Sequence, residues 1–385
     1  MERKAFIGLL VMFLCLGSVF SMTAMAQSPV RDPAKFWTRS EFFPLQLKDT
    51  PEIKAEMEKA RQLAGDDWYF LQTQRLQCSD VDESNTVVMP PGPNGSPAGG
   101  AATGFKEAPA VPTKVFDNVY YVGGMEVGGW IIDTGDGYIM LDSSYDYGVD
   151  TILLPNMAKL GLNPAKVKYI LITHGTGPKG GDHSGGVKYF HDNYGTKVVM
   201  SGPEWDRTKI NCGSAGPDCW VKSEDVIVGT DGQTLTLGNT TITMVYTPRS
   251  TTGGGMSYFI PVKIKGKRHM WATYGNTGIN GPLPNIQVYL DAMAKWFTYV
   301  DNLKPDIAIS SHPFVDGSIR RMEIIRECQD KRGRQDVCGP HNPFLIGKEG
   351  ARRYFEIMNQ CAVVRYDREA AGLPRDGLGT PDFQW

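Results

Sequence analysis

The spacing of apolar residues changes along the chain, predicting helices first and then a region that mixes strands with helices. From Pro51 to Gln77 apolar side chains recur at helical intervals, which predicts one or two helices broken near Gly65. From Thr113 onward the apolar residues form short runs of the β type. In "IIDTGDGYIML" a glycine-containing turn separates two such runs, so this segment predicts a hairpin.

Strands and helices then alternate to the end of the chain. Strands are predicted within residues 168–175, 197–202, 233–248, 256–275 and 305–313. Helices are predicted within residues 147–161, 184–194, 286–303 and 347–370. Because helices interspersed with strands can cover a sheet, this pattern predicts a layered α/β fold.

The first 26 residues have the features of a cleaved secretory signal. Arg3 and Lys4 precede a long apolar run, and the small residues Ala24 and Ala26 occupy the positions that a signal peptidase reads. An uncleaved anchor is the alternative, but the apolar run is shorter than the ~20 residues that a membrane span needs. We therefore expect residues 1–26 to be removed.

The rest of the chain divides into two predicted regions. Residues 27–112 comprise the helical extension and a flexible loop. The loop is predicted at residues 89–104, because this segment is too rich in Gly, Pro and Ala to pack. Residues 113–385 form the main domain. No internal repeat is evident in it.

Composition and charge narrow the class of protein. Apolar residues make up 41% of the chain, enough for a buried core. The formal net charge is −2 and the pI about 6.3, so there is no basic surface for nucleic acid. We expect a periplasmic or secreted protein with a small-molecule substrate, no nucleic-acid partner and no membrane association after signal cleavage.

Six cysteines remain once Cys15 leaves with the signal, and an even number in an oxidising compartment favours disulfides. None has the spacing of a zinc cluster, so metal ligation by cysteine is not expected. Two pairs each close a short loop, while the third either joins the two ends of the mature chain or remains as free thiols. The two short loops are closed by Cys212 with Cys219 and by Cys328 with Cys338. The third pair is Cys78 with Cys361.

Four residues suited to metal chemistry lie near predicted strand ends. His174 follows "YILIT", His312 follows "DIAIS", and Asp182 and His183 precede a helix. Zn²⁺ binds imidazole nitrogen and carboxylate oxygen in a four-coordinate shell, and a catalytic site keeps one position for water. Three protein ligands would therefore suffice.

The segment "THGTGPKGGDHSGG" resembles the central H-x-H-x-D-H motif of the metallo-β-lactamase superfamily, particularly its exported class B3-like group. The match rests on His174, Asp182, His183 and the glycines at 185–186. The resemblance runs from about Thr113 to the tail and includes the helix before "LQC". It implies an αββα metallo-β-lactamase-type sandwich with an N-terminal helical extension, and a site along one edge of the two sheets.

The motif is degenerate at one of the family's two metal positions. Thr176 stands where the family has its second histidine, and Ser250 in "YTPRSTTGG" stands where it has the third. Four extra residues, 178–181, also precede Asp182. Because a hydroxyl is a poorer zinc ligand than imidazole, the position that the family builds from three histidines should not hold metal tightly.

The second metal position is complete by residue type. It maps to Asp182, His183 and His312, so the resemblance implies a site for one zinc ion or none. Asp142 in "YIMLDSS" matches the strand-end aspartate that the family uses to orient a ligand from outside the coordination shell.

Three functions remain open. The first is a hydrolase of a small ester, lactone or related substrate that uses one metal ion. The second is a metal-independent lyase acting on a small or aromatic molecule. Its candidate acids and bases are His174, Lys179, Asp182, His183 and Tyr274, of which Lys179 and Tyr274 qualify only if they face the pocket. The third is a non-catalytic binding protein.

Overall fold

The computed structural model describes residues 49–79, 106–175, 181–248, 253–279, 281–330 and 342–373. All of them belong to one compact unit, Thr38–Trp385. The predicted signal and the Gly/Pro-rich loop lie outside the described residues, as do Thr176, Lys179 and Ser250.

The first sheet has seven strands, which lie in sequence order. Their bounds are β1 Thr113–Phe116, β2 Val119–Tyr121, β3 Trp130–Asp133, β4 Tyr138–Leu141, β5 Val167–Leu171, β6 Lys197–Met200 and β7 Val226–Val228. Strands β3 and β4 pair antiparallel, which confirms the predicted hairpin. From β4 to β7 the neighbours are parallel, so the carboxyl ends of these strands share one edge of the sheet.

The second sheet has five strands in the order β12-β11-β10-β9-β8. Their bounds are β8 Thr234–Leu237, β9 Thr240–Tyr246, β10 Met256–Ile264, β11 Lys267–Thr273 and β12 Ile307–Ala308. Strand β12 is much shorter than the strand predicted within 305–313, and it pairs parallel to β11. The remaining pairs are antiparallel.

The sheets pack face to face around a shared apolar core. On β10, Tyr258 and Ile260 point between the sheets, whereas Phe259 points to the opposite face. Trp130 of β3 meets Trp271 of β11 across the core, with ring centroids 5.2 Å apart. This packing fixes the strand ends of one sheet relative to those of the other.

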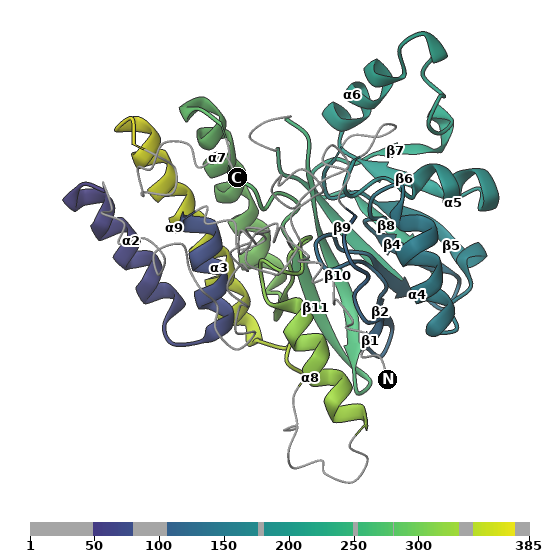
Figure 1. The fold of residues 1–385 in the computed structure, drawn as a ribbon, viewed down its shortest axis with the longest axis horizontal. Helices are drawn as coiled ribbons and strands as arrows, with labels where there is room; N and C mark the ends of the chain where they lie inside the picture. Colours follow the sequence, from purple (N-terminus) through teal and green to yellow (C-terminus); the bar gives the residue numbers. More distant parts are fainter. Residues whose placement is uncertain are drawn as a thin grey trace, which may run out of the picture. The chain divides into compact units, whose positions relative to one another are not determined.

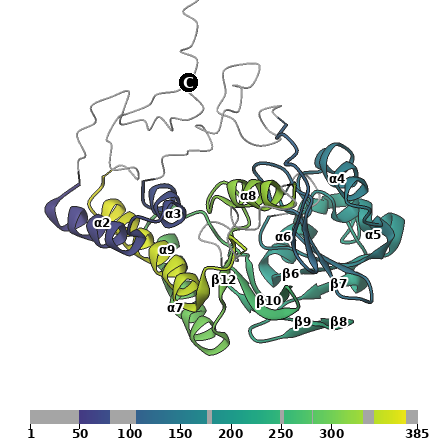
Figure 2. The ribbon, with the colours of Figure 1, turned by 90° about the horizontal axis from the view of Figure 1, so that it is seen from below.

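Helices cover both outer faces (Figures 1 and 2). Against the seven-stranded sheet lie a π-helical turn (Val149–Leu153), α4 (Leu154–Lys159), α5 (Val187–Tyr194) and α6 (Gly202–Cys212). Against the five-stranded sheet lie α2 (Pro51–Ala64), α3 (Trp68–Ser79), α7 (Leu283–Leu303) and α9 (Gly347–Ala370). This arrangement confirms the predicted αββα sandwich. The sequence patterns did not predict α6 or α8 (Ser318–Asp330).

The N-terminal helices are confirmed, and they pack in one apolar cluster with α7 and α9. Gly65, at φ 63°, ends α2 and lets the chain turn toward α3. On α9, Arg368 donates to both carboxylate oxygens of Asp49, at 2.8 and 2.7 Å. This buried, bidentate pair anchors the start of α2 to the last helix. Among the described residues no helix combines the length and apolar character that crossing a bilayer requires.

Two of the predicted disulfides are confirmed. Cys212 pairs with Cys219 across a sequence separation of 7, and Cys78 of α3 pairs with Cys361 of α9 across a separation of 283. Cys328 is also disulfide-bonded. Its expected partner, Cys338, lies outside the described residues.

The long-range disulfide should stabilise the fold more than the short one. In the chain-entropy view, closing loops with separations of 283 and 7 residues differs by about 3 kcal/mol in the free energy of unfolding. We therefore expect the double variant Cys78→Ala with Cys361→Ala to lose more stability than Cys212→Ala with Cys219→Ala. Denaturant titration checks this, and equal losses would contradict it.

Candidate metal centre

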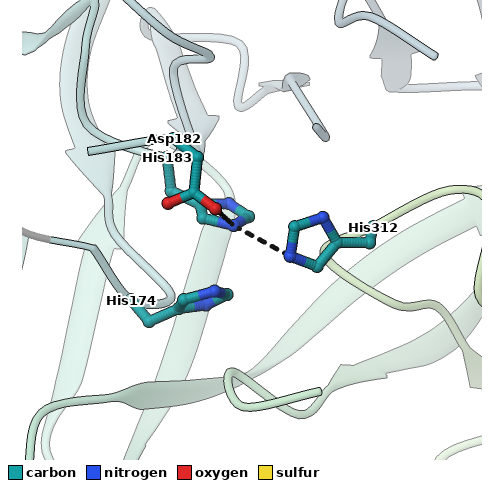
Figure 3. A group of neighbouring side chains, drawn as sticks. All are labelled: His174, Asp182, His183 and His312. Carbon is teal, nitrogen blue, oxygen red and sulfur yellow. Dashed lines mark hydrogen bonds and ion pairs between the residues drawn. The ribbon is translucent and has the colours of Figure 1, made fainter. Parts of the chain in front are cut away.

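Four side chains meet where strands of both sheets end (Figure 3). His174 follows β5, Asp182 and His183 lie in the turn before α5, and His312 follows β12. Their metal-binding atoms all lie within 4.8 Å of one another. The structure thus brings together the three predicted metal ligands and places His174 beside them.

The glycine pair of the motif explains how the turn of Asp182 and His183 reaches this position. A Cβ atom on Gly185 would lie 2.0 Å from the backbone nitrogen of Asp146, so only glycine fits there. The close approach lets the Gly185 N–H donate to the Ser144 oxygen at 2.8 Å. On the same loop the Ser143 N–H donates to the His183 oxygen at 2.8 Å.

His183 lies at the centre of the cluster and is fully buried. Its Nε2 is 3.3 Å from Nε2 of His312 and 3.5 Å from Oδ2 of Asp182. The rings of His174 and His183 have centroids 4.0 Å apart. Asp182 and His312 are partly exposed, and 30% of the Asp182 side chain is accessible to solvent.

Asp142 holds His183 from outside the cluster. It follows β4 in the left-handed region, at φ 56°, and its Oδ2 lies 2.8 Å from Nδ1 of His183. Because a carboxylate only accepts hydrogen bonds, Nδ1 of His183 carries the proton and donates it. In the neutral ring the lone pair is then on Nε2, the atom that faces His312.

Thr173 links the Asp142 carboxylate to His174 through hydrogen bonds. The Thr173 hydroxyl donates to Oδ2 of Asp142 at 2.8 Å, which uses its only hydrogen. The 3.2 Å contact between Oγ1 of Thr173 and Nδ1 of His174 is therefore donated by the histidine. His174 adopts the same tautomer as His183, with its lone pair on Nε2.

His312 is oriented by a backbone oxygen. Its Nδ1 lies 3.0 Å from the carbonyl oxygen of Glu126, which can only accept. Nδ1 again carries the proton, and Nε2 carries the lone pair. The ring planes of His183 and His312 are 80° apart, so their Nε2 atoms approach each other at an angle.

These tautomers concentrate electron density at one point. The Nε2 lone pairs of His183 and His312 face each other at 3.3 Å, with the Asp182 carboxylate close by. Such an arrangement is repulsive unless a cation, either a metal ion or a proton, lies among these atoms.

The donor set and its spacing fit zinc. Bonds of about 2.1 Å at tetrahedral angles place neighbouring ligand atoms about 3.4 Å apart. The measured separations of 3.3 and 3.5 Å agree with that value. Each imidazole also donates a hydrogen bond from its Nδ1–H to an acceptor, as ligating histidines do with the ring nitrogen that does not bind metal.

Tyr274 does not belong to the candidate site. Its residue is 1% exposed and its ring packs edge-on against Tyr289 and Trp296, at centroid distances of 5.6 and 5.7 Å. These neighbours lie on α7, in the apolar cluster outside the five-stranded sheet. Tyr274 is therefore a core residue that does not meet the condition for a role in proton transfer, which was that it faces the pocket. Lys179 lies outside the described residues.

Thr173 and Glu126 contribute to the site, and the sequence reasoning missed both. Glu126 acts through its backbone, which leaves no signature in the sequence, whereas Thr173 could have been noticed as a hydroxyl next to His174. Tyr145 is 4% exposed and stacks on Tyr147 at 5.1 Å. Burial raises the pKa of the Tyr145 hydroxyl far above its usual range, and the charges of Glu126 and Asp182 add to the effect. The Tyr145 hydroxyl therefore stays protonated at ordinary pH.

Known proteins of this fold share the architecture. Residues 127–259 match the family model described as "Metallo-beta-lactamase superfamily". Among solved structures, the chain is similar to the subclass B3 metallo-beta-lactamase BJP-1 of Bradyrhizobium japonicum, with 23% identity and a TM-score of 0.51, covering 69% of this chain and 96% of that one. It is also similar to FEZ-1 of Legionella gormanii (20%, 0.52, 69% and 99%) and to SMB-1 (21%, 0.54, 69% and 98%). No curated protein matches the chain significantly.

Residues 127–259 are therefore similar to the metallo-beta-lactamase superfamily, and the fold of the chain is that of the subclass B3 enzymes. The resemblance inferred from the motif is confirmed at this level. At identities of 20–23% these neighbours establish the fold, so activity must be argued from the site itself.

Replacing Asp142 by Asn should weaken metal binding about 10- to 100-fold. Asn tolerates the left-handed backbone of this position, so the loop should survive. Its amide, however, puts a donor among the donors of Thr173 and His183, which favours the His183 tautomer with a proton on Nε2. Competition with a chromophoric chelator measures the affinity.

Asp133→Asn is the matched control. Asp133 is the last residue of β3 in the same hairpin, but it accepts from the Gly135 N–H at the surface. Equal affinities of Asp142→Asn and Asp133→Asn would contradict the orienting role of Asp142.

Proposed function

We propose that this chain is a hydrolase of a small ester, lactone or related substrate that uses one metal ion. The observation that carries the proposal is the position of the His183 Nε2 atom. It lies 3.3 Å from Nε2 of His312 and 3.5 Å from the Asp182 carboxylate. A set of neutral imidazoles and one carboxylate is the ligand chemistry of catalytic zinc.

Asp182, His183 and His312 are the proposed ligands, and His174 lies against them as a fourth donor. A zinc ion bound there would lower the pKa of a coordinated water toward neutrality and polarise the bond to be cleaved. Asp142 keeps Nε2 of His183 unprotonated, because its carboxylate accepts a hydrogen bond from the Nδ1–H group. The Glu126 oxygen does the same for His312.

One of the proposed ligands also suits a proton transfer of hydrolysis. Asp182 faces solvent, so its carboxylate can accept a proton from an attacking water.

The sequence argues against a second metal ion. Thr176 and Ser250 replace two of the three histidines that the family places at its other metal position. We therefore propose a mononuclear hydrolase of a small molecule rather than an ordinary dinuclear β-lactamase. Export to the periplasm or medium, and the lack of nucleic-acid and membrane partners, remain part of the proposal on the strength of residues 1–26 and the net charge of −2.

A metal-independent lyase is the second candidate. The 3.3 Å separation of the His183 and His312 Nε2 atoms is also short enough for the two rings to share one proton. Such a pair could act as general base and then general acid in an elimination.

Metal content and activity, measured together, test the proposal. The protein would be purified from the periplasm without added zinc and assayed on esters, lactones and thioesters before and after chelation. We expect about one zinc per chain, loss of hydrolysis on chelation and recovery with zinc. Full activity with less than about a tenth of an equivalent of metal would overturn the proposal in favour of the lyase. Ligand binding without any turnover would favour a binding protein.

Asp182→Asn should lose both metal and activity. Asp192→Asn is its control, because Asp192 lies on the exposed side of α5 and pairs with Lys188 at 2.8 Å. If Asp182→Asn keeps its zinc and its turnover, Asp182 is not a ligand.

A further inference from the structure

Glu107 is a buried carboxyl group in the segment before β1, outside the residues that match the family model. Its residue is 4% exposed. The side chain fills the space above Gly124, where a Cβ atom would lie 2.1 Å from Oε2 of Glu107. Burial raises the pKa of Glu107 to about 7. Placing a carboxyl group there is costly, which raises the question of what it does.

One arm of the carboxyl group leads to His312. Oε2 of Glu107 accepts from the backbone N–H groups of Glu126 and Val127, at 2.8 and 3.0 Å. The Val127 N–H and the Glu126 carbonyl belong to the same peptide unit. In a planar trans peptide these two groups point in opposite directions. The Glu126 oxygen therefore points away from Glu107, and it accepts from Nδ1 of His312 at 3.0 Å.

A hydrogen bond to one end of a peptide unit polarises the other end. An N–H that donates to a carboxyl oxygen makes the carbonyl of its own unit a stronger acceptor. Glu107 thus acts on His312 through one peptide unit, whereas Asp142 acts on His183 directly. Each of the proposed ligands His183 and His312 is thus oriented by a carboxyl group, and the two carboxyl groups come from different segments.

The other arm joins Glu107 to the loop that carries Asp142. Oε1 of Glu107 accepts from the Ser144 hydroxyl at 3.2 Å. Ser144 has φ 59° and lies two residues after Asp142, which has φ 56°. One buried carboxyl group therefore fastens both loops that orient histidines. The loop of Glu126 is also tied to that of His312, because the Gly128 N–H donates to the Ser311 oxygen at 2.9 Å.

We propose that Glu107 is a positioning residue of the metal centre, which fixes the tautomer and orientation of His312 through the Glu126–Val127 peptide unit. This inference rests on the proposed function only for its consequence for metal affinity. The effect on His312 itself is independent of any metal.

The first test is made on protein from which a chelator has removed any bound metal. The chain has only six histidines, so long-range ¹H–¹⁵N NMR can assign their ring nitrogens. In the native protein we expect His312 to keep a proton on Nδ1, whether or not its Nε2 shares a further proton with His183. In Glu107→Ala the tautomers of His312 should mix, while His183, which Asp142 contacts directly, keeps its proton on Nδ1. Unchanged tautomers in a folded Glu107→Ala protein would overturn the proposal.

Conservative substitutions separate positioning from general structural support. Glu107→Gln keeps a carbonyl for the two N–H donors and should preserve the His312 tautomer. Glu107→Asp withdraws the carboxyl group by one methylene and replaces Glu107→Ala in the test if that variant fails to fold. Asp49→Asn loses a buried carboxylate far along the chain, in the contact with Arg368, and should leave His312 unchanged. A shift in Asp49→Asn as large as in Glu107→Ala would reduce Glu107 to a structural role.

The second test is metal affinity by chelator competition. We expect zinc binding to weaken about tenfold or more in Glu107→Ala and to stay within about threefold in Glu107→Gln. Equal affinities in all three proteins would contradict the positioning role. If the native protein binds no zinc, the proposed hydrolase fails, and the NMR measurement still decides the role of Glu107.

Discussion

The site depends on the orientation of its imidazole rings. In His174, His183 and His312 the Nδ1–H is held by an acceptor, which leaves Nε2 as the atom available to a cation. Two of these nitrogens stand 3.3 Å apart beside a carboxylate, an arrangement that neutral rings would not adopt without positive charge among them. The fold supplies the constraint, and the chemistry follows from it.

Both sheets are needed to build that constraint. His174 follows a strand of the seven-stranded sheet and His312 follows a strand of the five-stranded one, so the apolar packing between the sheets sets their separation. The left-handed backbone at Asp142 is a local strain that aims a carboxylate at His183. Glu107 comes from a third segment, before the first strand, and ties the supporting loops together.

The sequence was most informative where chemistry and backbone requirements coincide. The strand before His174 and the Asp-His turn with its glycine pair could be predicted from the residues. The structure shows that only glycine at position 185 allows the turn to approach the Asp146 loop so closely. The spacing of apolar residues likewise predicted strands interspersed with helices, whereas the arrangement in two sheets was implied by the resemblance.

Long-range and backbone contacts could not be predicted. Nothing in the residue type of Glu126 indicates that its carbonyl oxygen faces His312, 186 residues away in sequence. The position of Tyr274 in the core could not be predicted, because the sequence does not show which face of the predicted strand meets α7. Helix α6 lacks a strong apolar stripe, as much of its length, including Ile210, is exposed.

The position of a bound ion tests the central claim most directly. Crystals of zinc-loaded protein would be measured at the zinc absorption edge, where anomalous scattering locates the metal. One peak bonded to Nε2 of His183, Nε2 of His312 and the carboxylate of Asp182 is the predicted result. No peak, or a peak bonded through Nδ1 of either histidine, would contradict the account.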